Sequence, residues 1–352
     1  MSVLSQLKDA FKVKAHQVGF THIGIAEAFP APHIEAFQHW VEQGRHAGMA
    51  YLARPDTLAK RADPRLILEG CQRVICLAMP YLPPQAPLGE TRSAYGRVSA
   101  YALTVDYHLT IEEKLNELAQ FLNAHAPNAV AVRSYVDTGP VLERAFTADA
   151  GVGMPGKNTN LIIPGAGSYV FLAVMLTDLP LSVDPPFTRD LCRSCQRCIE
   201  ACPTGCILPD RTIDAGRCIS YLTIENKGII PDELKPKVGS WFFGCDICQM
   251  VCPHNTRPHG HSSPLGDPCL PEFVGLIEML AWDEFAFKTR LADTALLRAK
   301  RRGLLRNAAV VLGNQHNANA LPILRKHLSE ESDPVLQDAF AWAIRQIEGE
   351  DA

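Results

Sequence analysis

The sequence contains no long hydrophobic run. Its longest purely apolar stretch, from Val170 to Leu176, spans seven residues, whereas a membrane-spanning helix needs about 20. The N-terminal residues also lack the apolar core and cleavage site of a signal peptide, because lysines and an aspartate interrupt them. These absences exclude a helical membrane anchor and disfavour export. We therefore expect a soluble protein of the cytoplasm with no membrane partner.

Neither positive nor negative charge is in large excess. The 352 residues carry a formal net charge of -4, and 47% of them are hydrophobic, so a large core and two or three domains are expected. The exception is segment 288–306, where Asp293 alone stands against seven basic residues: Lys288, Arg290, Arg298, Lys300, Arg301, Arg302 and Arg306. Such a face is either the footprint of a polyanion or a solvated helix surface, and composition leaves both open.

The first half of the chain alternates between two kinds of segment. Helical periodicity covers 4–19, 33–44, 107–125 and 139–150, and strand-like patterns cover 21–26, 73–81, 130–137 and 168–180. This alternation predicts an α/β domain over residues 1–180.

Prolines at 180, 185 and 186 then open a cysteine-rich segment, 181–270. It has too few aliphatic residues for a core of its own, so a metal must organise it. Residues 271–352 are predicted to be helical, with Asp333-Pro334 as a helix start. Similar helices begin at Leu305 and Leu336, 31 residues apart, which indicates a fragment of a helical repeat.

The sequence has no export signal, and disulfides are rare in proteins that are not exported, yet the chain has twelve cysteines. Seven of them form two short runs, CRSCQRCIEACP at 192–203 and CDICQMVCP at 245–253. Without an export signal, this clustering favours metal ligands over disulfides. The first run fits the C-x2-C-x2-C-x3-C-P spacing of two-cluster ferredoxins, in which three cysteines bind one [4Fe-4S] cluster and the fourth binds the other.

The second run has Phe242 at the position of its leading cysteine, and Cys218 is the nearest cysteine between the runs. Cluster one is then expected on Cys192, Cys195, Cys198 and Cys252, and cluster two on Cys202, Cys218, Cys245 and Cys248. Zinc also binds paired C-x2-C motifs, but it does not require the three-cysteine run or the trailing prolines. The remaining cysteines are expected to be buried or incidental thiols: Cys71, Cys76, Cys206 and Cys269.

Two cofactor motifs are incomplete. GVGMPG at 151–156 follows a helix-like stretch and contains Pro155, which argues against a dinucleotide-binding turn. Asp106-Tyr107-His108 begins the D-x-H-x-x-G signature of histidine ligation to corrinoid cobalt, but Ile111 replaces the glycine. We therefore expect His108 to be a capping or packing residue.

YVDTGPVLER at 135–144 places Asp137 at the end of a strand, before a Gly-Pro turn. In open α/β sheets, ligands bind outside the carboxyl ends of the strands, which makes Asp137 a candidate site residue. The alternative is that Asp137 only caps the following helix. The residues alone favour this alternative.

Seven motifs together resemble those of the epoxyqueuosine reductase family, and they cover nearly the whole chain. In order, they are YVDTGPVLERAFTADAG, GKN, GSYVFLAVMLTDLPL, CRSCQRCIEACPTG, RCISYLTIE, GCDICQMVCPHN and RRGLLRNAAVVLGN. The resemblance implies a nitroreductase-like α/β cobalamin-binding domain, as in reductive dehalogenases, a two-[4Fe-4S] bacterial ferredoxin-like domain and a C-terminal α-helical HEAT-like domain. It also implies an oxidoreductase that reduces epoxyqueuosine to queuosine at the wobble position of tRNA, acting as a monomer with an external electron donor.

The same resemblance implies roles for individual residues. It supports the cluster ligands given above and makes Asp137 the proton donor. It places cobalamin (vitamin B12) beside Arg61, Tyr101, Lys157, Asn158, Ser168 and Tyr221, and tRNA on Arg298, Lys300, Arg301, Arg302 and Arg306. Two other interpretations stay open: a corrinoid reductase of a small molecule, and a non-catalytic electron carrier or tRNA-binding protein without cobalamin.

Overall fold

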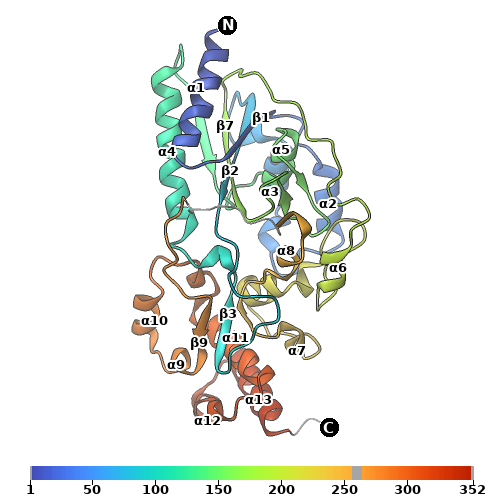
Figure 1. Ribbon diagram of the computed structural model, residues 1–352, viewed down its shortest axis with the longest axis vertical. Helices are drawn as coiled ribbons and strands as arrows, with labels where there is room; N and C mark the ends of the chain where they lie inside the picture. Colours follow the sequence, from blue (N-terminus) through green and yellow to red (C-terminus); the bar gives the residue numbers. More distant parts are fainter. Residues whose placement is uncertain (1, 256–263, 350–352) are drawn as a thin grey trace.

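The computed structural model describes residues 2–255 and 264–349, and a sheet with helices on both faces forms its N-terminal part (Figure 1). The strand order is β1-β2-β7-β4, and every neighbouring pair is antiparallel. The elements of this part are α1 (Val3–Gln17), β1 (His22–Glu27), α2 (Ile34–Glu42), α3 (Pro55–Ala62), β2 (Arg73–Pro80), α4 (Tyr107–His125), β4 (Val132–Tyr135), α5 (Glu143–Asp149), β5 (Met154–Pro155), β6 (Leu161–Ile162) and β7 (Val170–Thr177).

Alternation along β2 explains how the sheet is covered. Ile75 and Leu77 are fully buried in the core that contains α1 and α4, whereas Val74 and Cys76 are buried in the core that contains α5. Successive side chains of a strand point to opposite faces, so one apolar strand supplies both cores. The predicted α/β elements are therefore confirmed, with an antiparallel sheet at their centre.

A second sheet joins parts of the chain that the sequence assigns to three separate domains. β3 (Tyr95–Val98) pairs in parallel with β8 (Trp241–Phe243) and antiparallel with β9 (Phe273–Gly275). Phe242 in β8, at the position of the missing leading cysteine, is fully buried in the core of this part of the molecule. The domain boundaries predicted at 180 and 270 therefore separate strands that belong to one sheet, so they do not divide the chain into independent cores.

The C-terminal helices pack against this second sheet. α11 contributes the fully buried Ala308, Val311 and Leu312 to the same core as Phe242. Asp333 caps α13 by accepting the backbone N–H of Val335, and Pro334 is the first helical residue, as predicted. The helices are α9 (Leu276–Leu280), α10 (Glu284–Arg290), α11 (Lys300–Asn314), α12 (Leu321–Glu330) and α13 (Pro334–Glu348).

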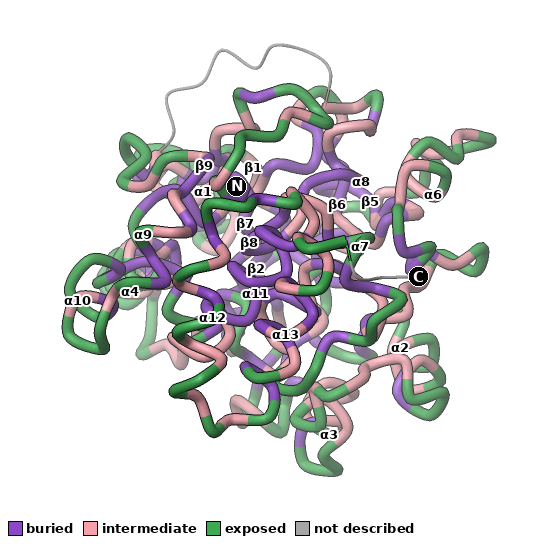
Figure 2. Tube along the Cα trace, turned by 90° about the horizontal axis from the view of Figure 1, so that it is seen from below, coloured by how far each residue is buried: buried purple, intermediate pink, exposed green. Residues whose placement is uncertain are grey.

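The cysteine-rich segment contains mostly short elements. They are α6 (Arg197–Ala201), the π-helical turn η5 (Tyr221–Glu225), α7 (Lys235–Val238) and α8 (Ile247–Met250). Short 3-10 turns complete the chain: η1 (Ala50–Leu52), η2 (Pro64–Leu66), η3 (Ala100–Ala102), η4 (Ala215–Arg217), η6 (Pro253–Asn255), η7 (Ala295–Ala299) and η8 (Ala318–Ala320). Buried chain gathers around β2, β7, β8 and α11, with α3, α6 and α10 at the periphery (Figure 2). Within the described ranges, no helix is both long and apolar enough to span a membrane.

Candidate functional site

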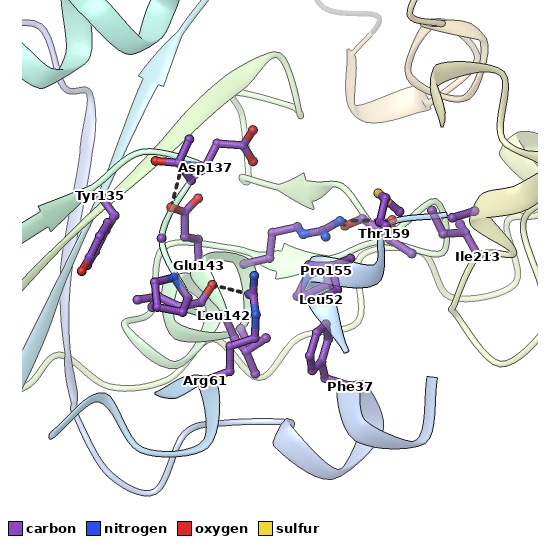
Figure 3. A pocket seen from close by; sticks show the side chains of 18 of the residues that line it. Phe37, Leu52, Arg61, Tyr135, Asp137, Leu142, Glu143, Pro155, Thr159 and Ile213 are labelled. Carbon is purple, nitrogen blue, oxygen red and sulfur yellow. Dashed lines mark hydrogen bonds between the residues drawn. The ribbon is translucent and has the colours of Figure 1, made fainter. Parts of the chain in front are cut away.

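A cavity of about 1810 Å³ opens where the sheet domain meets the cysteine-rich segment. Residues of α2, α3, the β4–α5 connection, η5 and η7 line it. Figure 3 shows Asp137 and Glu143 on one wall of this space, with Arg61 and Phe37 on another and Ile213 across from them. Typical small-molecule pockets measure about 300–1,000 Å³, so this cavity suits a large ligand or two ligands together.

Asp137 is exposed to this cavity at the end of β4. Its backbone N–H donates to Glu143 Oε1 at 2.9 Å, and its Oδ2 accepts from the Tyr107 hydroxyl at 3.0 Å. The N-cap of α5 is Leu142, so the alternative that Asp137 caps this helix is wrong. Asp137 does line the cavity just beyond the carboxyl end of β4, although β4 lies in an antiparallel sheet.

Tyr107 holds the Asp137 carboxylate from a rigid position. Its ring stacks between Phe171, at 4.2 Å, and His108, at 4.1 Å. Burial raises the pKa of Tyr107, and the charge of Asp137 raises it further. The hydroxyl thus stays protonated and donates to Asp137.

His108 has the packing role that the incomplete D-x-H-x-x-G motif predicts. Besides its stacking on Tyr107, its Nδ1 lies 2.7 Å from Asp106 Oδ1. Asp106 also caps α4 by accepting the backbone N–H of His108. The other ring nitrogen, Nε2, is buried without a partner among the described residues.

Charged residues surround the Asp137 loop. Burial raises the pKa of Glu143 well above its usual range, and the charge of Asp137 adds to this effect. Arg61 donates to the Val141 carbonyl at 3.0 Å, while its Nε is buried without a partner in the described part of the chain. Arg144 donates to the Thr159 carbonyl at 2.7 Å. Sequence analysis missed Tyr107, Glu143 and Arg144, although all three fall inside motifs that it singled out.

Three of the predicted cobalamin residues line the cavity: Arg61, Tyr101 and Tyr221. The other three do not line it. The Lys157 ammonium donates to the carbonyls of Arg193 and Cys195, Asn158 contacts the Cys248 carbonyl, and Ser168 bonds to Gln249. These three side chains connect the β5–β6 region to the cysteine runs, and their contact with cobalamin stays a prediction.

The structure brings together the cysteines predicted for cluster one. They line a cavity of about 30 Å³, formed in part by Cys192, Cys195, Cys198 and Cys252. This arrangement unites the first run with the last cysteine of the second run, across 54 to 60 positions of sequence. The crossed spacing of the two runs predicts the same grouping.

The cysteines predicted for cluster two also lie close together. Burial raises the pKa of Cys245, and the thiolates of Cys248 and Cys218 raise it further. Cys218 also lines the large cavity. A hydrogen bond from Cys206 lowers the pKa of Cys202 to about 4, which favours the thiolate that binds metal.

The basic residues of the C-terminal part differ in accessibility. Arg298 and Lys300 are exposed, and Arg298 pairs with Glu225 at 2.7 Å on the cavity wall. Arg301 and Arg302 are half-buried and donate to the Trp282 carbonyl and to Asp333. Arg306 is only 2% exposed. Its predicted contact with tRNA is wrong in this conformation, because its guanidinium is directed into the protein.

Two family models match the chain. Residues 61–138 match "Epoxyqueuosine reductase QueG, DUF1730", and residues 191–255 match "4Fe-4S double cluster binding domain". The chain is 38% identical to an epoxyqueuosine reductase of Pseudomonas aeruginosa, over 97% of this chain and 95% of that protein.

Solved structures of similar sequence have the same fold. An epoxyqueuosine reductase in complex with an epoxyqueuosine-modified tRNA-Tyr stem loop superposes with a TM-score of 0.86 at 32% identity, covering 97% of this chain and 90% of that one. A Bacillus subtilis epoxyqueuosine reductase, with its catalytic loop swung out of the active site, superposes with a TM-score of 0.85 at the same identity and the same coverage. The sequence match and the shared architecture agree, and the chain belongs to the epoxyqueuosine reductase family.

Proposed function

We propose that this chain reduces epoxyqueuosine to queuosine at the wobble position of tRNA. It would act as a cytoplasmic monomer that takes electrons from an external donor, passes them through two [4Fe-4S] clusters to cobalamin, and uses Asp137 as the proton donor. The observation that carries this proposal is that Asp137 and Cys218, a predicted cluster ligand, line the same large cavity. The proposed cluster and the proposed proton donor would therefore act at the same site.

The cysteines fit two clusters. Four thiols meet around one small cavity. Of the other four predicted ligands, Cys218 lines the large cavity and lies close to Cys245 and Cys248. Cubane clusters are held by four cysteine thiolates each. The two groups share both cysteine runs, so the clusters would lie close enough to exchange electrons.

The large cavity fits cobalamin in size and in polarity. Its volume exceeds that of ordinary small-molecule sites. Two buried polar atoms on its wall, Arg61 Nε and His108 Nε2, have no partner within the described residues. Unpaired buried polar groups are rare, and each calls for an explanation such as a bound polar ligand. Arg61, Tyr101 and Tyr221 would hold the cofactor.

The reaction removes one oxygen atom: the epoxide, two electrons and two protons give the alkene and water. Bound cobalamin would supply the electron pair that opens the epoxide ring. Ring opening leaves a negative charge on oxygen, and the Asp137 carboxyl, which faces the cavity, would donate a proton to this atom. Tyr107 orients Asp137 through the 3.0 Å hydrogen bond, and the nearby Glu143 fixes the backbone of the same residue.

The rim of the cavity suits an anticodon loop. Arg298 lines the cavity, and Lys300 is exposed two residues further along the chain; both are placed to contact phosphates. A modified base in a folded loop must be splayed out before it enters an active site. The solved relative with a modified tRNA stem loop supports this assignment.

The test is mass spectrometry of nucleosides after anaerobic incubation of epoxyqueuosine-containing tRNA with the reduced, cobalamin-loaded protein. Asp137→Asn should retain full iron content and cobalamin binding but give no queuosine. Asp9→Asn changes an exposed aspartate of α1 that is not among the cavity-lining residues, so it serves as the matched control and should remain active. An active Asp137→Asn variant would remove Asp137 from the donor role. An unchanged nucleoside with the unaltered protein, with both cofactors verified, would overturn the proposed reaction.

A further inference from the structure

A fifth thiol, that of the buried Cys206, lies among the predicted ligands of cluster two. Cys206 Sγ is 3.5 Å from Cys202 Sγ, and Cys206 also hydrogen-bonds with Cys218. Cys206 is 4% exposed, so no solvent competes for its S–H group. The two-cluster spacing has no place for this residue. The site therefore holds one more sulfur than a [4Fe-4S] cluster binds.

A second donor approaches the same sulfur. Thr204 Oγ1 lies 3.5 Å from Cys202 Sγ, and Thr204 is 1% exposed. A ligating cysteine is a thiolate and can only accept, so both the hydroxyl and the thiol must donate to it. Cys202 thus receives side-chain hydrogen bonds from two buried neighbours.

The backbone holds these two donors in place. Gly205, at a φ of 62°, turns the chain between them, and its N–H donates to the Cys202 carbonyl at 3.1 Å. Arg217 donates to the Thr204 carbonyl at 2.8 Å, and the Cys206 carbonyl accepts from the Asp214 N–H at 2.9 Å. The turn therefore fixes the backbone positions of both residues beside Cys202.

We propose that Cys206 is a non-ligating thiol that, together with Thr204, raises the reduction potential of cluster two by donating hydrogen bonds to its ligand sulfur. A donor to a ligand sulfur stabilises the additional negative charge of the reduced cluster, and hydrogen bonds to sulfur are among the factors that set the potential of such clusters. Cys206 is a positioning residue, because it touches a ligand and not the substrate. Its effect favours electron transfer onto the cluster whose ligand Cys218 lines the cavity.

The test is a redox titration of the anaerobically reconstituted protein, followed by electron paramagnetic resonance, with iron content measured in parallel. Cys206→Ala should keep full iron content and lower one of the two midpoint potentials while the other stays constant. Thr204→Val should lower the same potential. Cys206→Ser keeps a donor and should restore it. Cys269→Ala, which removes an exposed thiol, is the matched control and should change neither.

Two results would overturn the inference. Unchanged potentials in Cys206→Ala would show that the thiol does not act on the cluster, and loss of iron from this variant would make Cys206 a ligand. The inference rests on the proposed two clusters but not on the reduction of epoxyqueuosine. The iron content and resonance signals of the unaltered protein test the clusters separately, so the two failures can be told apart.

Discussion

Arg306 connects the C-terminal helices to the loop that carries part of the candidate site. Its guanidinium donates to the carbonyls of Leu222 at 2.6 Å and of Asn226 and Gly228 at 2.8 Å each. Burial lowers the pKa of Arg306 to about 10, so the side chain remains charged at neutral pH. Replacing it with methionine keeps the apolar stem but removes every donor.

The expected loss of local stability follows from the three carbonyls that lose their hydrogen-bond donor. Each buried acceptor left without a partner costs about 1–3 kcal/mol, and the lower value applies because water can reach the exposed Gly228. Three such groups give about 3 kcal/mol in the free energy of local unfolding, which corresponds to a roughly 100-fold increase in the opening equilibrium. Hydrogen exchange of the amides in 219–228 measures this opening directly.

Arg301→Met is the matched control on the same helix. Arg301 donates to the Trp282 carbonyl at 3.0 Å, outside 219–228, so its removal should change exchange in 219–228 little. The salt dependence of tRNA affinity separates a structural role from a tRNA contact. Lys300→Ala should reduce the slope of the logarithm of the binding constant against the logarithm of salt concentration by about 0.7–0.9, the value of one phosphate contact. Arg306→Met should leave this slope unchanged. Normal exchange together with a reduced slope in Arg306→Met would refute the structural role and restore the tRNA contact.

Two further predictions concern hydrogen-bonded carboxylates. Tyr107→Phe removes the hydroxyl that donates to Asp137. Because a hydrogen bond to a charged group contributes about 1.5–3 kcal/mol, kcat should fall at least about tenfold while iron content stays unchanged. Normal turnover would contradict this. Burial opposes ionisation of Asp184, but hydrogen bonds from Lys8 and Lys12 hold its pKa below the usual value. This stabilisation is present above the unfolded pKa of about 3.9 and is lost as the pH falls through the lower folded pKa. Asp184→Asn should therefore lower the urea midpoint at pH 7, with a difference that shrinks below about pH 4; a difference independent of pH would refute the ion pairs.

Local patterns in the sequence were sufficient for much of the fold. The helix predicted over 107–125 is α4, and the strand predicted over 73–81 is β2 within one residue. Asp333 and Pro334 start α13 as expected. Periodicity and capping are properties of a few neighbouring residues, so they can be recognised without knowledge of the partners that cover each face. The cysteine spacings likewise indicated clusters, because ligand geometry limits the spacing of neighbouring ligands.

Only the tertiary structure decided which of these segments meet. The antiparallel strand order, the insertion of β3 between β8 and β9, and the burial of Arg306 all depend on contacts between distant residues. The sequence therefore predicted a basic surface where the fold buries one of the arginines. It predicted a buried or incidental thiol at Cys206, which the fold buries against Cys202, a predicted ligand. Local pattern alone favoured a helix cap at Asp137, and only the family resemblance made it the proton donor. The sequence determined the chemistry available to this protein, and packing across long stretches of chain determined which groups came close enough to use it.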